Sequence, residues 1–178
     1  MEFTTKGGVE IPLRSVGRRY VQQIFSKYEF PDPPTYTVEL VGGGTQTFPH
    51  NVTKEGSTLV TPEDVKAWAE YQDEVVTITG TRFEKLIHFL LYECVLLDPP
   101  PVEEWSVDHD AWGLEVPDPQ EDKVAHKVFW IDNELLVDPD DQAALVALLY
   151  QDAGIIGADD VAEFELFFRS TVERLASS

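Results

Sequence analysis

Four histidines are the residues that could supply a general base, and they lie far apart in the sequence. They are His50, His88, His109 and His126. A hydrolytic site would also need an activated Ser, Thr or Cys and an orienting carboxylate beside one of them. The sequence contains no nucleophile-elbow or cysteine-protease pattern, and the apolar surroundings of His88 favour a structural role. We therefore predict that the chain has no catalytic residues and is not an enzyme.

Carboxylates and imidazoles gather between residues 108 and 126, where they could in principle bind a divalent cation. The spacing lacks the regular alternation and the glycine of an EF-hand loop, and it is not the His/Cys spacing of a zinc site. A solvated acidic loop is therefore favoured, and we expect neither a metal site nor a cofactor. The residues concerned are Asp108, His109, Asp110, Glu115, Glu121 and His126.

The triple glycine at residues 42–44 is the remaining pattern with a chemical interpretation. A phosphate-binding loop would require a following lysine and the start of a helix, and neither is present. Instead Tyr36, Val38 and Leu40 alternate with polar residues before the glycines, and a second polar and apolar run follows them. This arrangement is typical of a β-hairpin, which we predict within residues 35–50.

Composition limits the classes of partner. The 178 residues are 43% hydrophobic, which is sufficient for one sizeable core, and the formal net charge is −20. Such a charge disfavours binding to nucleic acid and to anionic membranes. Residues 1–30 hold five basic groups against three acidic ones, so the acidic excess lies in the remaining residues. No sequence stretch is long and apolar enough to span a bilayer, and we predict an intracellular, soluble protein.

The single cysteine, Cys94, excludes an intramolecular disulfide. It lies in the most apolar stretch of the sequence, residues 86–97, where a buried and unreactive thiol is expected.

Apolar residues at helical spacing predict five helices. Thr61 with Pro62, and Asp138 with Pro139, have the N-cap and first-turn chemistry that begins a helix. Residues 75–81, VVTITGT, are β-branched and fit either a short strand or a continuation towards the next helix. The five predicted helices cover residues 14–29, 62–73, 82–96, 139–152 and 159–175.

These elements predict an α+β fold that is mostly α-helical, with a small β-hairpin and a C-terminal helical pair. Residues 1–34 would form an amphipathic helix and a proline-rich linker, and residues 35–97 the hairpin with the central helices. Residues 98–138 would form an acidic loop containing proline and tryptophan, and residues 139–178 a helical hairpin. We expect one compact domain overall.

Seven aromatic and basic residues are candidates for partner binding, because aromatic and arginine side chains are enriched where proteins meet. Core packing is the alternative for each aromatic residue, and for the two tryptophans the more common role is to anchor the loop on the chain's own core. The candidates are Arg18, Arg19, Tyr20, Phe25 and Tyr28 in the first helix, with Trp105 and Trp112 in the acidic loop.

The order of features between residues 16 and 170 is similar to that of a known group of short acidic proteins. It consists of PDPPTYTVELVGGG, TFPHN, TPEDVKAWAEYQ, EKLIHFLLYECV, an acidic EEW segment and a terminal helical pair. The positions that carry the likeness are Tyr36, Gly42, Gly43, Pro49, His50, Trp68, Tyr71, Lys85 and Leu86. In this pattern the chain resembles the tail assembly chaperones of long-tailed bacteriophages, although VVTITGT stands where an uninterrupted charged helix is expected.

The resemblance implies a non-enzymatic protein of the host cytoplasm. Such a protein would bind the tape measure protein, the tail tube protein or both during tail morphogenesis, and would be absent from finished particles. The basic residues 14–27 could contact the acidic body of a second copy and so permit homo-oligomers along the client.

Two other functions fit the sequence. An acidic mimic of nucleic acid could inhibit a host DNA-binding enzyme, in which case binding would weaken steeply with salt and compete with DNA. A structural tail-completion protein would instead remain in purified virions.

Overall fold

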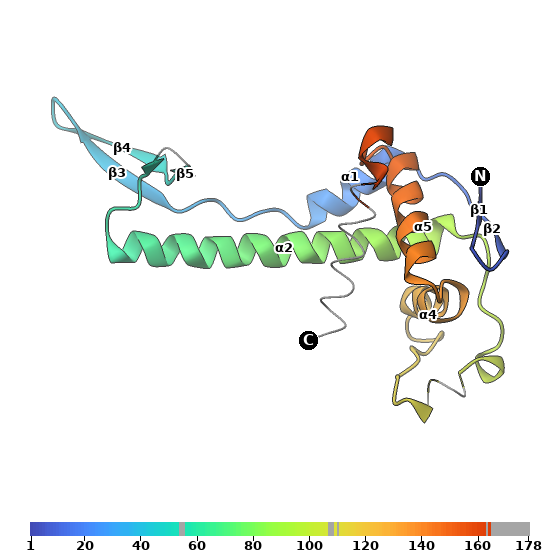
Figure 1. Cartoon of the computed structure of the whole chain (residues 1–178). Coiled ribbons are helices and arrows are strands. Elements are labelled where there is room, and N and C mark those ends of the chain that lie inside the picture. The colour runs from blue at the N-terminus through green and yellow to red at the C-terminus, as the bar shows by residue number, and fades with distance from the viewer. Residues whose placement is uncertain (54–55, 107–108, 110, 163, 165–178) are drawn as a thin grey trace. The chain divides into compact units, whose positions relative to one another are not determined.

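The computed structural model describes residues 1–53, 56–106, 109, 111–162 and 164 (Figure 1). Contacts within the chain divide it into two compact units, described separately below: unit 1 comprises Met1–Ile24 and Glu84–Ser178, and unit 2 comprises Phe25–Phe83. The described residues are mostly helical, with small antiparallel two-stranded sheets. The predicted α+β, mostly helical fold class is therefore confirmed.

Helix α2, Pro62–Cys94, is a single helix that contributes residues to both units (Figure 1). Thr61 caps its start, as the sequence predicted, since the Asp64 amide donates to Thr61 Oγ1 at 3.1 Å. The Thr61 amide in turn donates to Asp64 Oδ2 at 2.9 Å, which completes a capping box. The two helices predicted at residues 62–73 and 82–96 are thus one helix, and the open question at residues 75–81 is resolved in favour of helix.

Three threonines explain how this β-branched stretch remains helical. The hydroxyl groups of Thr77, Thr79 and Thr81 each donate to the carbonyl oxygen four residues earlier, at 2.9, 2.7 and 3.0 Å. Each hydroxyl therefore finds its partner inside the helix instead of competing for an extended backbone.

The core of unit 1 is built by the end of α2, by α4 (Lys123–Trp130) with the π-helical turn Ile131–Leu135, and by α5 (Pro139–Asp152). Helix α5 has the predicted bounds and begins at the predicted N-cap, Asp138. Burial raises the pKa of the Cys94 thiol to about 11, so the thiol is protonated at neutral pH. The largest side chains buried in this core include Leu86, Leu90, Leu91, Ile131, Leu145, Val146 and Leu149.

Helix α4 lies inside the stretch predicted as a loop, residues 98–138, so that prediction was wrong for residues 123–130. Asp122 caps the helix, accepting hydrogen bonds from the amides of Val124 and Ala125 at 3.0 and 2.9 Å. The helix is only 8 residues long and follows a run of acidic residues and prolines. The apolar periodicity of so short a helix cannot be distinguished from the sequence of the loop around it. A 3-10 turn, Val102–Glu104, also lies in this stretch.

An N-terminal hairpin, β1 (Glu2–Thr4) and β2 (Glu10–Pro12), was not predicted. Strands of three residues show too little alternation to be recognised. The hairpin is held in unit 1 because Ile11 is fully buried and because two backbone bonds join the following chain to the end of α2. The Arg14 amide donates to the Cys94 carbonyl at 2.9 Å, and the Leu96 amide donates to the Pro12 carbonyl at 3.0 Å.

Helix α1, Arg18–Lys27, is shorter than the predicted helix at residues 14–29. Residues 12–14 instead lie extended beside the end of α2, where Leu13 forms an antiparallel bridge with Val95 and the Arg14 amide donates to the Cys94 carbonyl. Most of the helix predicted at residues 159–175 lies outside the described residues. Its start is a 3-10 turn, Ala158–Asp160, and the described residues 161, 162 and 164 are helical.

In unit 2, strands β3 (Thr35–Leu40) and β4 (Gly44–Pro49) pair antiparallel, which confirms the predicted hairpin. Gly42 and Gly43 form the turn with φ values of 123° and 87°, which side chains other than glycine rarely adopt. A smaller pair, β5 (Val52–Thr53) and β6 (Gly56–Ser57), follows the hairpin.

The helical state of residues 75–81 gives a stability prediction. Gly80 lies inside α2 with open space where a Cβ would stand. Gly80→Ala should therefore raise the free energy of unfolding by about 0.5–1 kcal/mol, since alanine favours a helix interior. Urea denaturation followed by circular dichroism measures this change.

Gly43→Ala is the matched control, because the same added methyl group falls on a backbone with positive φ. It should lower the stability of unit 2 by about 1 kcal/mol or more. A loss of stability in Gly80→Ala would contradict the helical assignment.

Candidate partner-binding surfaces

One face of the β3–β4 hairpin is apolar and exposed. The strand register places Tyr36 opposite Phe48, and it puts Val38 and Leu40 on the same side of the hairpin, whereas threonines occupy most of the other side. Val38, Leu40 and Phe48 are 39%, 47% and 36% exposed, and Val41 at the turn is fully exposed. We call Tyr36, Val38, Leu40 and Phe48 the hairpin face. An antiparallel sheet normally packs such a face against a core, so its exposure marks a candidate protein-binding surface.

His50 fixes the base of this hairpin within unit 2. Its ring is buried, with Nδ1 3.2 Å from Thr58 Oγ1 and Nε2 3.4 Å from Asp64 Oδ1. The Tyr36 ring lies 5.0 Å from the imidazole, between centroids. His50 therefore has a structural use: it joins the end of β4 to the beginning of α2.

The carboxylate that His50 meets is held in its charged form. Hydrogen bonds from the backbone and side chain of Thr61 lower the pKa of Asp64, with smaller effects from the Val60 amide and from His50. The capping box that begins α2 thus also provides the anion at the base of the hairpin.

Three of the predicted partner-binding residues, Arg18, Arg19 and Tyr20, are exposed on the part of α1 that belongs to unit 1. Tyr20 is 58% exposed, which is unusual for a large aromatic side chain. These residues are accessible to a partner, and their binding role stays a prediction.

Phe25 and Tyr28 belong to unit 2 and are partly buried. Arg82 on α2 donates hydrogen bonds to the carbonyl oxygens of both residues, at 3.1 Å for Phe25. The guanidinium also lies 3.9 Å from the centroid of the Phe30 ring, a close cation–π contact. Sequence reasoning did not single out this arginine, which holds the backbone of both residues. The binding role of the Phe25 and Tyr28 side chains stays a prediction.

The two tryptophans of the acidic stretch differ. Trp105 is 9% exposed, and its indole Nε1 donates to the Pro100 carbonyl at 3.2 Å. Its ring packs against His126 and Phe129, with centroids 5.5 and 6.2 Å away. The self-packing alternative therefore describes Trp105, whereas Trp112 is 81% exposed.

Sequence reasoning missed a histidine–carboxylate pair in unit 1. His109 Nε2 lies 2.6 Å from Glu134 Oε1, and the imidazole packs against the rings of Trp105 and Phe129. Glu134 belongs to the π-helical turn after α4. The partners are separated by 25 positions in the sequence, which explains why no local pattern predicts the pair. The buried His109 packs among aromatic rings, whereas its partner Glu134 stays partly exposed, so the pair has a structural use at the edge of the core.

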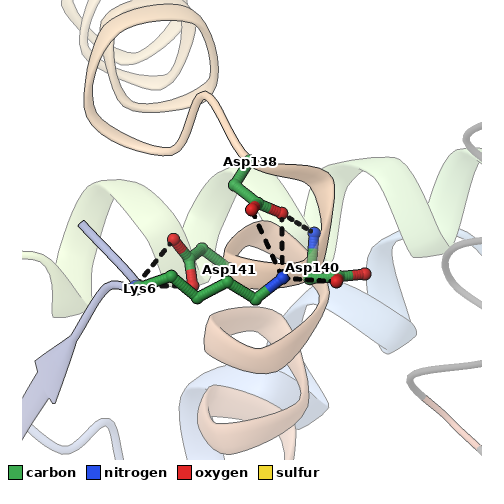
Figure 2. Close-up of polar contacts among 4 residues, drawn as sticks. All are labelled: Lys6, Asp138, Asp140 and Asp141. Carbon is green, nitrogen blue, oxygen red and sulfur yellow. Dashed lines mark hydrogen bonds and ion pairs between the residues drawn. The ribbon is translucent and has the colours of Figure 1, made fainter.

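A cluster around Lys6 joins the turn after β1 to the start of α5 (Figure 2). The Lys6 amide donates to both oxygens of the buried Asp141 carboxylate at 3.0 Å, and its ammonium meets Asp138 at 3.3 Å and also Asp140. The hydrogen bond to Asp140 is the main cause that raises the Lys6 pKa, and the Asp140 amide is the main cause that lowers the Asp138 pKa. The three carboxylates thus neutralise a lysine and the N-terminus of a helix, which is a structural use.

Within the part of the chain that the structure describes, no three His, Cys, Asp or Glu side chains are grouped so that they could hold a metal ion. None of the described helices is long and apolar enough to cross a membrane.

Comparison with protein-family models, with curated proteins and with solved structures found no match for this chain.

The Lys6 cluster gives a stability prediction. Asp141→Ala should lower the free energy of unfolding by about 1–3 kcal/mol, because it leaves the Lys6 amide without its buried acceptor. Asp140→Ala is the control with the same change of charge, and it should have a much smaller effect, since exposed ion pairs contribute little. Chemical denaturation of both variants tests the difference, and equal losses would show that the amide bond is unimportant.

Asp64 gives a pH prediction. Because its pKa is lowered in the folded protein, its contribution to stability is present above the ordinary aspartate pKa and is lost as the pH falls through the lowered value. An NMR titration of the Asp64 carboxyl carbon should show a midpoint below the ordinary value. Thr61→Val removes a hydroxyl that holds the anion and should raise this midpoint, whereas Thr79→Val, farther along α2, should leave it unchanged. An unchanged midpoint in Thr61→Val would contradict the role of the capping box.

Proposed function

We propose that this chain is a non-enzymatic tail assembly chaperone that binds the tape measure protein, the tail tube protein or both in the host cytoplasm. The observation that carries the proposal is the exposed hairpin face on a chain of net charge −20. Exposed apolar side chains provide contact area for a client, and the negative charge keeps the loaded protein dispersed. The sequence resemblance supplies the identity of the client.

The size of the hairpin face supports many weak contacts in place of one strong contact. Burying a whole valine, leucine or phenylalanine side chain contributes about 1.5–3 kcal/mol, and these side chains are already more than half covered. A gain of about 1 kcal/mol from each of the four side chains does not exceed the entropic cost of association, about 4 kcal/mol or more, so one hairpin face alone binds a client weakly. Several copies along one long client would bind by avidity, as expected of a protein that covers a tape measure.

The exposed basic end of α1 supports assembly of such copies. Arg18 and Arg19, beside Tyr20, form a basic and aromatic surface on a protein whose other regions are acidic. Attraction between this surface and the acidic body of a second copy would offset part of the repulsion between like-charged molecules. Binding to the client should therefore weaken with salt more than an apolar contact alone would.

The test is affinity purification of the tagged chain from phage-infected cells, with bound proteins identified by mass spectrometry. The wild type should recover a tape measure or tail tube protein. A double variant, Val38→Thr with Leu40→Thr, keeps strand propensity but removes apolar area from the hairpin face, and it should recover about tenfold less. Thr45→Ser with Thr47→Ser, on the other side of the hairpin, is the matched control and should bind normally.

Two outcomes would overturn the proposal. Recovery of a host DNA-binding enzyme that DNA displaces would favour the acidic mimic of nucleic acid. Presence of the chain in purified virions would favour a structural tail-completion protein.

A further inference from the structure

A pocket of about 480 Å³ lies in unit 1, apart from the hairpin face and from the exposed residues of α1. This volume falls within the range of pockets that bind ligands. Its lining includes Tyr92 and several prolines, together with Lys123, His126 and Lys127 of α4. Two ammonium groups at one pocket are notable in a chain with 13 basic and 33 acidic residues.

Lys127 is a buried cation with incomplete compensation. The residue is 8% exposed, and a buried ammonium is stable only when it is paired and hydrogen-bonded. Among the described residues, its acceptors are the Val95 carbonyl at 2.7 Å and Asp98 Oδ1 at 3.4 Å. The Asp98 side chain is 88% exposed, so its long contact is readily exchanged with water.

The bond to Val95 fixes the ammonium in place, and the Tyr92 ring, 5.4 Å from Nζ, adds a cation–π contact. Lys123 lies four residues earlier on α4 and therefore on the same face of the helix as Lys127. The two charges thus line the pocket together, one buried and hydrogen-bonded and the other exposed.

Part of the pocket lining is a rigid and apolar proline wall. Three consecutive prolines, at residues 99–101, have restricted backbones and no N–H donors. Trp105 holds this run through its bond to the Pro100 carbonyl. A preformed wall of this kind favours an apolar ligand body, because little conformational entropy is lost on binding.

We propose that this pocket binds an acidic peptide segment of a protein partner, with a glutamate or aspartate carboxylate on Lys127 and a neighbouring apolar side chain against the proline wall. The carboxylate would take the place of Asp98 on the ammonium and would be shared with Lys123. Asp98 lies at the solvent-exposed end of the pocket, so a surface segment of another protein can reach this position. A polyanion such as nucleic acid fits poorly, because the chain as a whole carries −20.

The test is an NMR titration of the full chain with two capped dipeptides, N-acetyl-Phe-Glu-amide and its neutral counterpart N-acetyl-Phe-Gln-amide. The acidic peptide should shift the backbone amide signals of Asp98, Val102, Lys123 and Lys127. Its affinity should exceed that of the neutral peptide by about tenfold, the effect expected of one charge-assisted hydrogen bond.

In Asp98→Asn the affinity for the acidic peptide should increase, a change that a purely structural role for Lys127 does not predict. Removing this exposed carboxylate takes away the competitor for the ammonium, so the acidic peptide should bind about two- to fivefold more tightly. Lys123→Gln should weaken binding by a similar factor, whereas Lys66→Gln, an exposed lysine of unit 2, makes the same change of charge and should have no effect. Both pocket positions are exposed, so these variants should remain folded.

Equal affinity for the two peptides would overturn the proposal, and so would unchanged or weaker binding in Asp98→Asn. The double variant Val38→Thr with Leu40→Thr should bind the acidic peptide normally, since the hairpin face belongs to unit 2. The pocket and the proposed chaperone function can therefore fail independently.

Discussion

The continuous hydrogen bonding of α2 through residues 75–81 is the constraint on which both units depend. The same helix supplies Asp64 and Arg82 to unit 2 and the buried Leu86 and Leu90 to unit 1. Its middle is its weakest part by propensity, because it combines β-branched residues with Gly80. The threonine hydroxyls donate to carbonyl oxygens of the preceding turn, so they do not compete with the helix for backbone hydrogen bonds. Burial of apolar side chains near the C-terminal end of α2 supplies the stability that helix propensity lacks.

Elements defined by neighbouring residues were predictable from the sequence. Thr61 with Pro62 and Asp138 with Pro139 mark helix starts because a cap and its amide partners lie within three residues of each other. Glycines between alternating strands mark the β3–β4 turn for the same reason. Helix α4 and the N-terminal hairpin could not be predicted, since both are short and are held by contacts with distant parts of unit 1.

Candidate sites were harder to predict than elements, because exposure and pairing are tertiary properties. Trp105 and Trp112 occupy the same acidic stretch of the sequence. Trp105 is buried by its indole bond to Pro100 and by three ring contacts, whereas Trp112 is exposed to solvent. The amide of Lys6 finds Asp141 across 135 positions, and Lys127 finds Val95 across 32. An alternating pattern predicts that the hairpin has an apolar face, but it does not show whether another element packs against that face. The exposure of the hairpin face was therefore not predictable either.

The burial of Cys94 has a practical consequence for following this protein in solution. Its thiol is 1% exposed and protonated at neutral pH, so thiol-directed reagents should not react with it while the fold is intact. It is also the sole cysteine of the chain. A cysteine introduced at the fully exposed Val41 would therefore accept a fluorophore or spin label selectively, and no native residue would need to be removed. The turn of the β3–β4 hairpin could then report directly on whatever approaches it.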